Sequence, residues 1–189
     1  MNPERRADFV LIVLKKPDGE VAGAMNASYI PARDQEGKDL GWSFVVVNYI
    51  VSEVKGAAIG LYAALDEKCG AIAASRGETV KYTVGETVPE VEGLVNKTGR
   101  ARLYADKGGV MIEVPYFQAP LEWEEDGTPQ TLPVPLHLMA KSSTNEKTIS
   151  KEDLLRIVDG IFDYNSRGNA EDSCDEAGYA AACASVDET

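Results

Sequence analysis

Residues 100–117 have the sequence RARLYADKGGVMIEVPYF, which is the clearest β-hairpin pattern in the chain. Small or apolar residues alternate with Arg100, Arg102 and Tyr104, as expected for a strand with one buried face. The turn falls at residues 106–109, where two glycines can adopt positive φ. If the loop has two residues, a single pairing register of the two strands places all their small or apolar residues on one face of the hairpin. Only one register does this, so the pattern specifies the pairing.

The patterns on either side of this hairpin predict a β-rich domain. Strands are expected at 8–15, 20–30, 42–54, 78–84, 118–123 and 131–139, and helices at 57–75 and from Ser150 onward. The strand at 42–54 is apolar on both faces and is therefore expected to be central. Pro133 and Pro135 favour an edge position for the strand at 131–139. This order predicts an α+β fold of about eight strands, OB-like or a related small barrel or sheet, with one helix after the third strand and a C-terminal helix.

Both predicted helices have an apolar stripe. The first stripe consists of Ile59, Tyr62, Leu65, Cys69 and Ile72, and Gly77 stands where a C-cap belongs. The second consists of Leu154, Ile157, Val158 and Ile161, after an N-cap at Ser150.

Charge is unevenly distributed along the 189 residues. Residues 1–118 carry 14 Lys and Arg against 16 Asp and Glu, a balance of −2, whereas residues 119–189 carry 5 against 15, a balance of −10. The sequence therefore predicts one globular domain at 1–168 and an acidic, disordered tail at 169–189. No stretch approaches the ~20 apolar residues of a membrane helix. Three cysteines without metal spacing indicate free thiols and a cytoplasmic location.

No motif for catalysis is found. His137 is the only histidine, and nothing beside it marks a nucleophile, so a structural role is favoured. One histidine and scattered cysteines cannot make a standard zinc site. Residues 163–168 begin like a calcium loop, but Cys174 stands where the bidentate Glu belongs. Gly56 and the glycines at 108–109 are interpreted as turn residues and not as a phosphate-binding loop. No catalytic residue, metal or cofactor is therefore expected.

A basic patch with aromatic rings is the remaining candidate site. It consists of Lys81, Tyr82, Lys97, Arg100, Arg102, Tyr104 and Lys107. Cations that bind phosphates and rings that stack on bases are what single-stranded nucleic acid requires. The resulting hypothesis is a non-enzymatic, single-stranded nucleic-acid-binding protein whose acidic tail recruits proteins. The alternative is a structural or assembly protein, with edge strands used for protein contacts or homo-oligomers.

Overall fold

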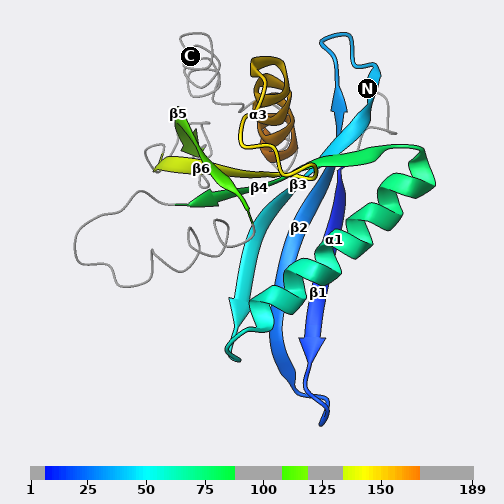
Figure 1. Ribbon diagram of the computed structural model, residues 1–189, viewed down its shortest axis with the longest axis vertical. Helices are drawn as coiled ribbons and strands as arrows, with labels where there is room; N and C mark the ends of the chain where they lie inside the picture. The colour runs from blue at the N-terminus through cyan, green and yellow to red at the C-terminus, as the bar shows by residue number, and fades with distance from the viewer. Residues whose placement is uncertain (1–6, 88–107, 119–133, 167–189) are drawn as a thin grey trace, which may run out of the picture. The chain divides into compact units, whose positions relative to one another are not determined.

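The computed structural model describes residues 7–87, 108–118 and 134–166 of the chain (Figure 1). The chain divides into two compact units, Met1–Gly85 and Glu86–Thr189. The described elements are β1 Asp8–Lys15, β2 Val21–Arg33, β3 Asp39–Ser52, α1 Ala57–Arg76, β4 Thr79–Thr87, β5 Val110–Gln118, β6 Val134–Ser142 and α3 Lys151–Ser166.

The sheet is open and mixed, so the prediction of an OB-like barrel is wrong. The strand order is β1-β2-β3-β4-β6-β5, which leaves β1 and β5 at the edges. The pairs β1–β2, β2–β3 and β5–β6 are antiparallel, but β3 and β4 are parallel. A parallel pair requires a crossover, and α1 supplies it between β3 and β4. The described residues contain six strands, whereas about eight were expected for the chain.

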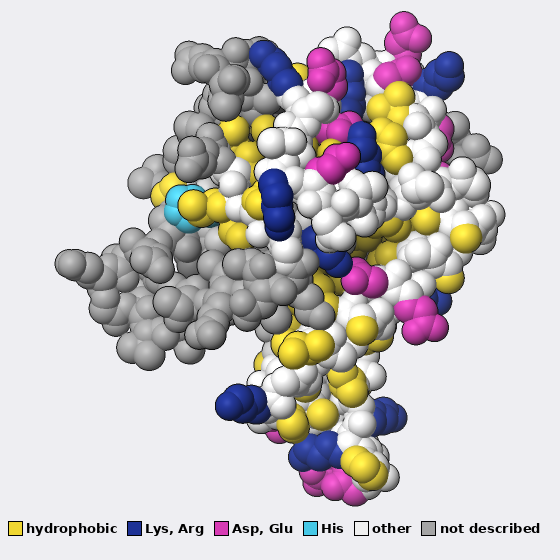
Figure 2. Space-filling model, viewed as in Figure 1, with side chains coloured by type: hydrophobic (Ala, Val, Ile, Leu, Met, Phe, Trp, Pro, Cys, Tyr) yellow, Lys and Arg dark blue, Asp and Glu magenta, His cyan; other side chains and the backbone are white. Residues whose placement is uncertain are grey.

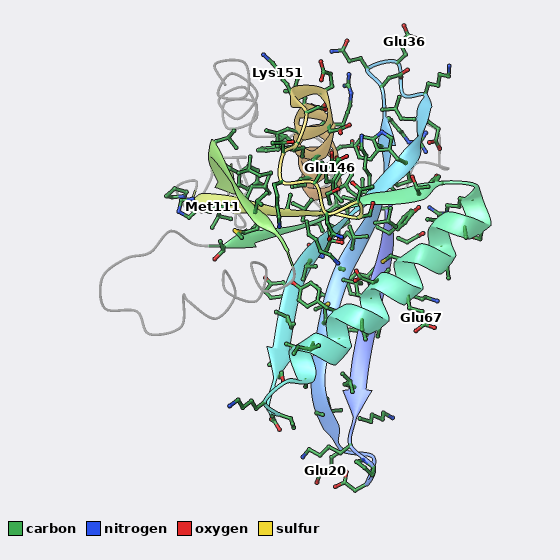
Figure 3. The ribbon with its side chains drawn as sticks, in the orientation of Figure 1. Glu20, Glu36, Glu67, Met111, Glu146 and Lys151 are labelled. Atoms are coloured by element: carbon green, nitrogen blue, oxygen red, sulfur yellow. The ribbon has the colours of Figure 1, made fainter. Side chains whose placement is uncertain are left out.

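In the first unit, α1 lies across one face of β1, β2 and β3 (Figure 1). Small residues allow this close packing: a Cβ on Gly60 would lie 3.1 Å from Leu14 Cδ1, and one on Gly23 would lie 3.3 Å from Leu61 Cδ1. The side of α1 directed away from the strands is polar and carries Glu67 (Figure 3).

The predicted stripe of α1 is largely confirmed. Tyr62, Leu65 and Cys69 are buried, but Ile59 is 56% exposed, so its place in the core was predicted wrongly. Burial, with a smaller contribution from the carboxylate of Asp66, raises the pKa of the Cys69 thiol to about 11. The predicted C-cap is also confirmed, because Gly77 has a φ of 70° and its N–H bonds to the last turn of the helix.

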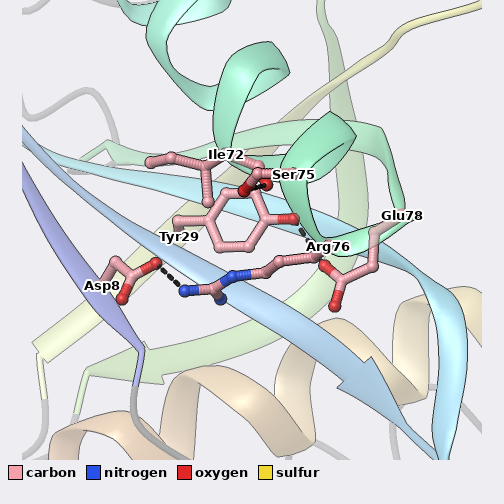
Figure 4. Close-up of polar contacts among 6 residues, drawn as sticks. All are labelled: Asp8, Tyr29, Ile72, Ser75, Arg76 and Glu78. Atoms are coloured by element: carbon pink, nitrogen blue, oxygen red, sulfur yellow. Dashed lines mark hydrogen bonds and ion pairs between the residues drawn. The ribbon is translucent and has the colours of Figure 1, made fainter.

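A polar cluster fixes the C-terminal end of α1 to the strands (Figure 4). The hydroxyl of buried Tyr29 donates a hydrogen bond of 2.5 Å to Glu78 Oε2. The Arg76 guanidinium lies 5.2 Å from the centre of the Tyr29 ring and pairs with Asp8 Oδ2 at 2.5 Å. The cluster therefore joins β1, β2, the end of α1 and the residue before β4. Burial, followed by the hydrogen bond to Glu78, raises the pKa of Tyr29 above its usual value of 10.0.

In the second unit, β5 pairs with β6. The predicted strand at 110–117 is confirmed as β5, while its expected partner at 100–106 lies outside the described residues. The described partner of β5 is β6, with Ile112 opposite Leu138. Because β6 lies between β4 and β5, the edge position inferred from Pro135 is wrong. Pro135 stands at the second residue of the strand, where a missing N–H disrupts little of the ladder.

Helix α3 begins as the sequence predicts. Ser150 Oγ accepts a hydrogen bond of 3.1 Å from the Asp153 N–H, which is the expected N-cap contact. The predicted stripe of Leu154, Ile157, Val158 and Ile161 is buried. Phe162 adds an edge-to-face contact with Tyr116, whose ring centre lies 6.3 Å away. The Tyr116 hydroxyl donates to Glu86 Oε1, and burial raises the pKa of Tyr116.

Neither described helix is long and apolar enough to cross a membrane. The tail at 169–189 lies outside the described residues, so its disorder and the domain boundary at residue 168 stay predictions.

The raised pKa of Tyr29 predicts a loss of stability in alkali. Below pH 10.0 the Tyr29 phenol is neutral in both the folded and the unfolded chain. Above pH 10.0 the phenol ionises in the unfolded chain but stays neutral in the folded chain. The free energy of unfolding therefore falls as pH rises. Tyr29→Phe should make the urea midpoint fall less steeply between about pH 9 and pH 11. Equal slopes for wild type and Tyr29→Phe would contradict this account.

The burial of the α3 stripe predicts a large cost for truncation. Ile157 is fully buried, so Ile157→Ala should lower the free energy of unfolding by ~2–4 kcal/mol in a denaturant titration. Leu155→Ala, at a half-buried position of the same helix, should cost less. Equal costs for the two variants would show that the stripe is not part of the core.

Candidate functional site at the start of helix α1

The parallel pairing of β3 and β4 stops before either strand ends. Their register runs from Trp42 opposite Thr79 to Val47 opposite Gly85. Strand β3 then continues to Ser52, still paired with β2 on its other side. No described strand pairs with residues 48–52 on the β4 side. Among the described strands, this leaves an edge of β3 without a partner at the carboxyl end of a parallel pair, where ligands of α/β sheets characteristically bind.

A β-bulge at Asn48 coincides with the end of this pairing. On β2, Asn26 is opposite Tyr49 and Ala27 is opposite Val47, so Asn48 is the extra residue. Its side-chain Nδ2 donates a hydrogen bond of 3.0 Å to Ser28 Oγ on the neighbouring strand. A bulge bends its strand and increases the local twist, which gives a physical reason for β3 to leave β4 at this residue.

Strand β3 passes into α1 through a short turn that ends at Gly56. This residue occupies the N-cap position with a φ of 87°, a conformation that favours glycine. The turn is held by the Ser52 hydroxyl, which donates to the Val54 carbonyl at 2.7 Å, and by the Ala57 N–H, which donates to the same oxygen at 3.1 Å. No side chain caps the helix.

The start of α1 is therefore suited to an anion. The first turn has no acidic residue, and Lys55 stands directly before the N-cap. Positions 56–58 carry only Gly and Ala, so no bulky side chain of theirs shields the N–H groups. The dipole of a 20-residue helix adds partial positive charge at this end. In Figure 2, hydrophobic side chains gather over the lower part of the molecule, where α1 begins.

The surface predicted to bind nucleic acid stays a prediction, because only two of its residues are described. Lys97, Arg100, Arg102, Tyr104 and Lys107 lie outside the described residues. Lys81 and Tyr82 are on β4, where the Lys81 ammonium lies 5.2 Å from the Trp42 ring centre and 5.6 Å from that of Tyr82. Tyr82 is buried, and the edge of its ring packs against Trp42, so it offers no open face for a base.

Other candidates weighed from the sequence also stay without a site. His137 is half-buried on β6. Within 7–87, 108–118 and 134–166, no group of three His, Cys, Asp or Glu residues could hold a metal ion.

Sequence reasoning missed the start of α1 because Gly56 was taken for an ordinary turn residue. A usable signal was present: a long β-branched strand leads directly into Gly56 and Gly60, which open an alanine-rich helix. Glycine between a strand and a helix is what a phosphate-binding turn requires, although the spacing here matches no standard motif.

Comparison with known proteins gives structural likeness only. No family model and no curated protein sequence matches the chain. Arabidopsis thaliana NAA60 in complex with acetyl-CoA is 13% identical over 72% of this chain and 77% of its own, with a TM-score of 0.45. Chaetomium thermophilum Naa20 with a bisubstrate analogue is 11% identical over 70% and 65%, with a TM-score of 0.42. An acetyltransferase from Bacillus cereus is 12% identical over 75% and 79%, with a TM-score of 0.38.

These findings correct the function predicted from the sequence. The OB-like body assumed for a single-stranded nucleic-acid binder is replaced by an open mixed sheet. A protein described as nourseothricin acetyltransferase and an acetyltransferase from Bacillus cereus are among the similar solved structures. The prediction of a non-enzymatic nucleic-acid-binding protein is therefore wrong.

The backbone at Gly56 predicts opposite effects for two glycine substitutions in this region. Gly56→Ala should lower the free energy of unfolding by ~1–2 kcal/mol, because an L side chain is strained at that φ. Gly70→Ala, inside α1 with open space around it, should raise stability by up to ~1 kcal/mol. Chemical denaturation of both variants measures the change in the free energy of unfolding. No change for Gly56→Ala would show that the turn adapts to the added side chain.

Proposed function

We propose that the chain is an acyltransferase that binds acyl-CoA at the start of α1 and along the free edge of β3, and transfers the acyl group to an amine. The proposal rests on one observation: the β3–β4 pairing ends at Val47 and Gly85, and β3 then continues into the turn before an uncapped helix N-terminus. Acetyl-CoA is the ligand named for one similar structure, that of NAA60.

The anionic end of the ligand fits the start of α1. Coenzyme A carries a pyrophosphate, and phosphate oxygens accept hydrogen bonds from backbone N–H groups at a helix N-terminus. The N–H groups of Gly56 and Ala58 lie next in sequence to the Lys55 cation, with no acidic residue in the first helical turn. The glycine and alanine side chains allow a phosphate to approach the backbone closely.

The arm of the ligand fits the edge of β3. The pantetheine arm of coenzyme A is extended and contains two amides, so it can pair with a strand edge as another strand would. Residues 48–52 present an edge without a described partner, and this edge leads into the turn at Gly56. The groups that would bind the phosphates and the amides of the ligand thus lie along one continuous stretch of chain.

The reaction is an exchange of bonds at the thioester carbonyl. The C–S bond breaks, a C–N bond to the amine forms, and the amine proton is transferred to the departing thiolate. Negative charge develops on the carbonyl oxygen during attack, and backbone N–H groups directed at that oxygen stabilise it. The free edge of β3 can supply such a group.

The cytoplasmic location expected from the sequence is part of this proposal, supported by the free thiol of Cys69. Recruitment of proteins through the acidic tail stays a prediction, because residues 169–189 lie outside the described part of the chain.

A charge placed in the first turn of α1 tests the binding site. Ala58→Glu should preserve the fold, because acidic residues near a helix N-terminus are favourable, but it should repel the ligand phosphates. Titration calorimetry with acetyl-CoA should show Kd raised at least ~10-fold, which corresponds to ~1.4 kcal/mol. Ala71→Glu adds the same charge to an exposed position further along the helix and should change Kd by less than about twofold.

Two further measurements separate the parts of the proposal. 3′-Phosphoadenosine 5′-diphosphate, which keeps both phosphorus atoms of the pyrophosphate but lacks the pantetheine arm, should bind more weakly than coenzyme A if that arm pairs with β3, and equal affinity would remove β3 from the site. Release of free thiol from acetyl-CoA in the presence of primary amines tests transfer itself. No binding of acetyl-CoA to the wild type, or equal binding to both charge variants, would refute the proposed site.

A further inference from the structure

Strand β3 changes the face on which its side chains lie at Asn48. Val47 is buried and lies opposite Ala27 on β2. Tyr49, two residues later, is 66% exposed and lies opposite Asn26, the neighbour of Ala27. Side chains two residues apart on a regular strand share a face, so the opposite burial of these two shows the effect of the extra residue. Every side chain after Asn48 is on the face that it would not occupy in an unbulged strand.

The extra residue also decides which backbone groups are directed to the unpaired edge of β3. Along a strand, the N–H and C=O groups of successive residues point alternately to one side and to the other. Residues 49–52 remain paired with β2 as far as Ser52, which is opposite Gly23. Their other backbone groups point to the side on which no described strand pairs beyond Val47. A shift of one residue would exchange the two sets, so the bulge sets which groups this edge offers.

A side-chain hydrogen bond ties the bulge to β2. Asn48 Nδ2 donates to Ser28 Oγ at 3.0 Å. Ser28 is fully buried in the sheet, so the acceptor has a fixed position. If β3 slipped by one residue along β2, Asn48 would move away from Ser28 and the bond would break. The bond therefore opposes slippage of the strand at the residue where its pairing with β4 has ended.

We propose that Asn48 is a positioning residue for the arm of the ligand. Its bond to Ser28 fixes the bulge, and the bulge fixes the backbone groups that residues 49–52 offer to the arm. Asn48 acts through the strand backbone, because its side-chain amide is bonded to β2. The inference rests on the proposed function, in which this edge binds the arm of acyl-CoA. Phosphate binding should not depend on Asn48, because the turn before α1 has its own hydrogen bond from Ser52 to Val54.

Two ligands measured by titration calorimetry test the proposal: coenzyme A, and 3′-phosphoadenosine 5′-diphosphate, which lacks the arm. Asn48→Ala should raise the Kd of coenzyme A at least ~10-fold, as expected when hydrogen bonds to the arm are lost. The Kd of the ligand without the arm should change by less than about twofold. Asn48→Asp should restore most of the ratio between the two affinities, because its carboxylate can accept a hydrogen bond from the Ser28 hydroxyl.

A double-variant cycle tests whether Asn48 and Ser28 act together. Ser28→Ala should raise the Kd of coenzyme A as much as Asn48→Ala does, and the combined variant should bind no more weakly than either. Ser43→Ala is the matched control. Ser43 is also fully buried, but its hydroxyl donates to the Thr79 carbonyl in the part of β3 that pairs with β4. Its loss should leave the ratio of the two affinities as in the wild type.

The possible failures separate this inference from the proposed function. If Asn48→Ala binds coenzyme A as the wild type does, or if the effects of Asn48→Ala and Ser28→Ala are additive, Asn48 has no positioning role and the acyl-CoA site still stands. An equal loss of affinity for both ligands would also overturn the positioning role, because it would show general damage to the fold. No binding of coenzyme A by the wild type would overturn the proposed function together with this inference.

Discussion

The arrangement of the candidate site depends on where β3 stops pairing with β4. Up to Val47 the two strands share hydrogen bonds, and beyond it β3 has its bulge at Asn48. A parallel sheet without this irregularity would satisfy the β3 edge with β4 backbone and leave nothing for a ligand. Beyond the extra residue, residues 48–52 of β3 have no partner on the β4 side among the described strands, and the proposed ligand site uses this edge.

Helix α1 is held differently at its two ends. Its last turn is fixed by Arg76, which pairs with Asp8 and lies over the Tyr29 ring, and by the Gly77 cap. Its first turn has only backbone contacts, a glycine N-cap and small side chains. The anchored end sets the direction of the helix, and the open end is the part that the proposed ligand would contact. Such a division is what a preorganised anion site requires, because the donors are in place before binding.

The sequence predicted the local elements far better than their assembly. Strand β1, helix α1 with its Gly77 cap, and helix α3 with its Ser150 cap follow from periodicity and capping residues, which act over one or two turns. The parallel pairing of β3 with β4 could not be read in this way, because it joins residues 37 or 38 positions apart. An OB barrel also places a helix after its third strand, so element order alone did not discriminate between the folds.

The site was missed for a related reason. Gly56 and Lys55 are ordinary surface residues when considered singly, and their chemistry depends on the helix that follows and the strand edge beside them. By contrast, the basic residues at 97–107 form a conspicuous local cluster, and the hypothesis drawn from the sequence rested on them. A cluster of basic residues in the sequence shows only that charges lie close together along the chain. A ligand site also requires backbone groups with the right positions and directions.

The buried thiol of Cys69 has a consequence for a chain that handles activated acyl groups. Thioesters acylate thiolates readily, so a reactive cysteine on the helix that binds the ligand would capture the acyl group in place of the amine. With a pKa of about 11, this thiol is ionised in only about one molecule in ten thousand at neutral pH, and the surrounding core excludes the reagent. Under the proposed function, the packing that stabilises α1 would thus also protect the chain from modification by acyl-CoA.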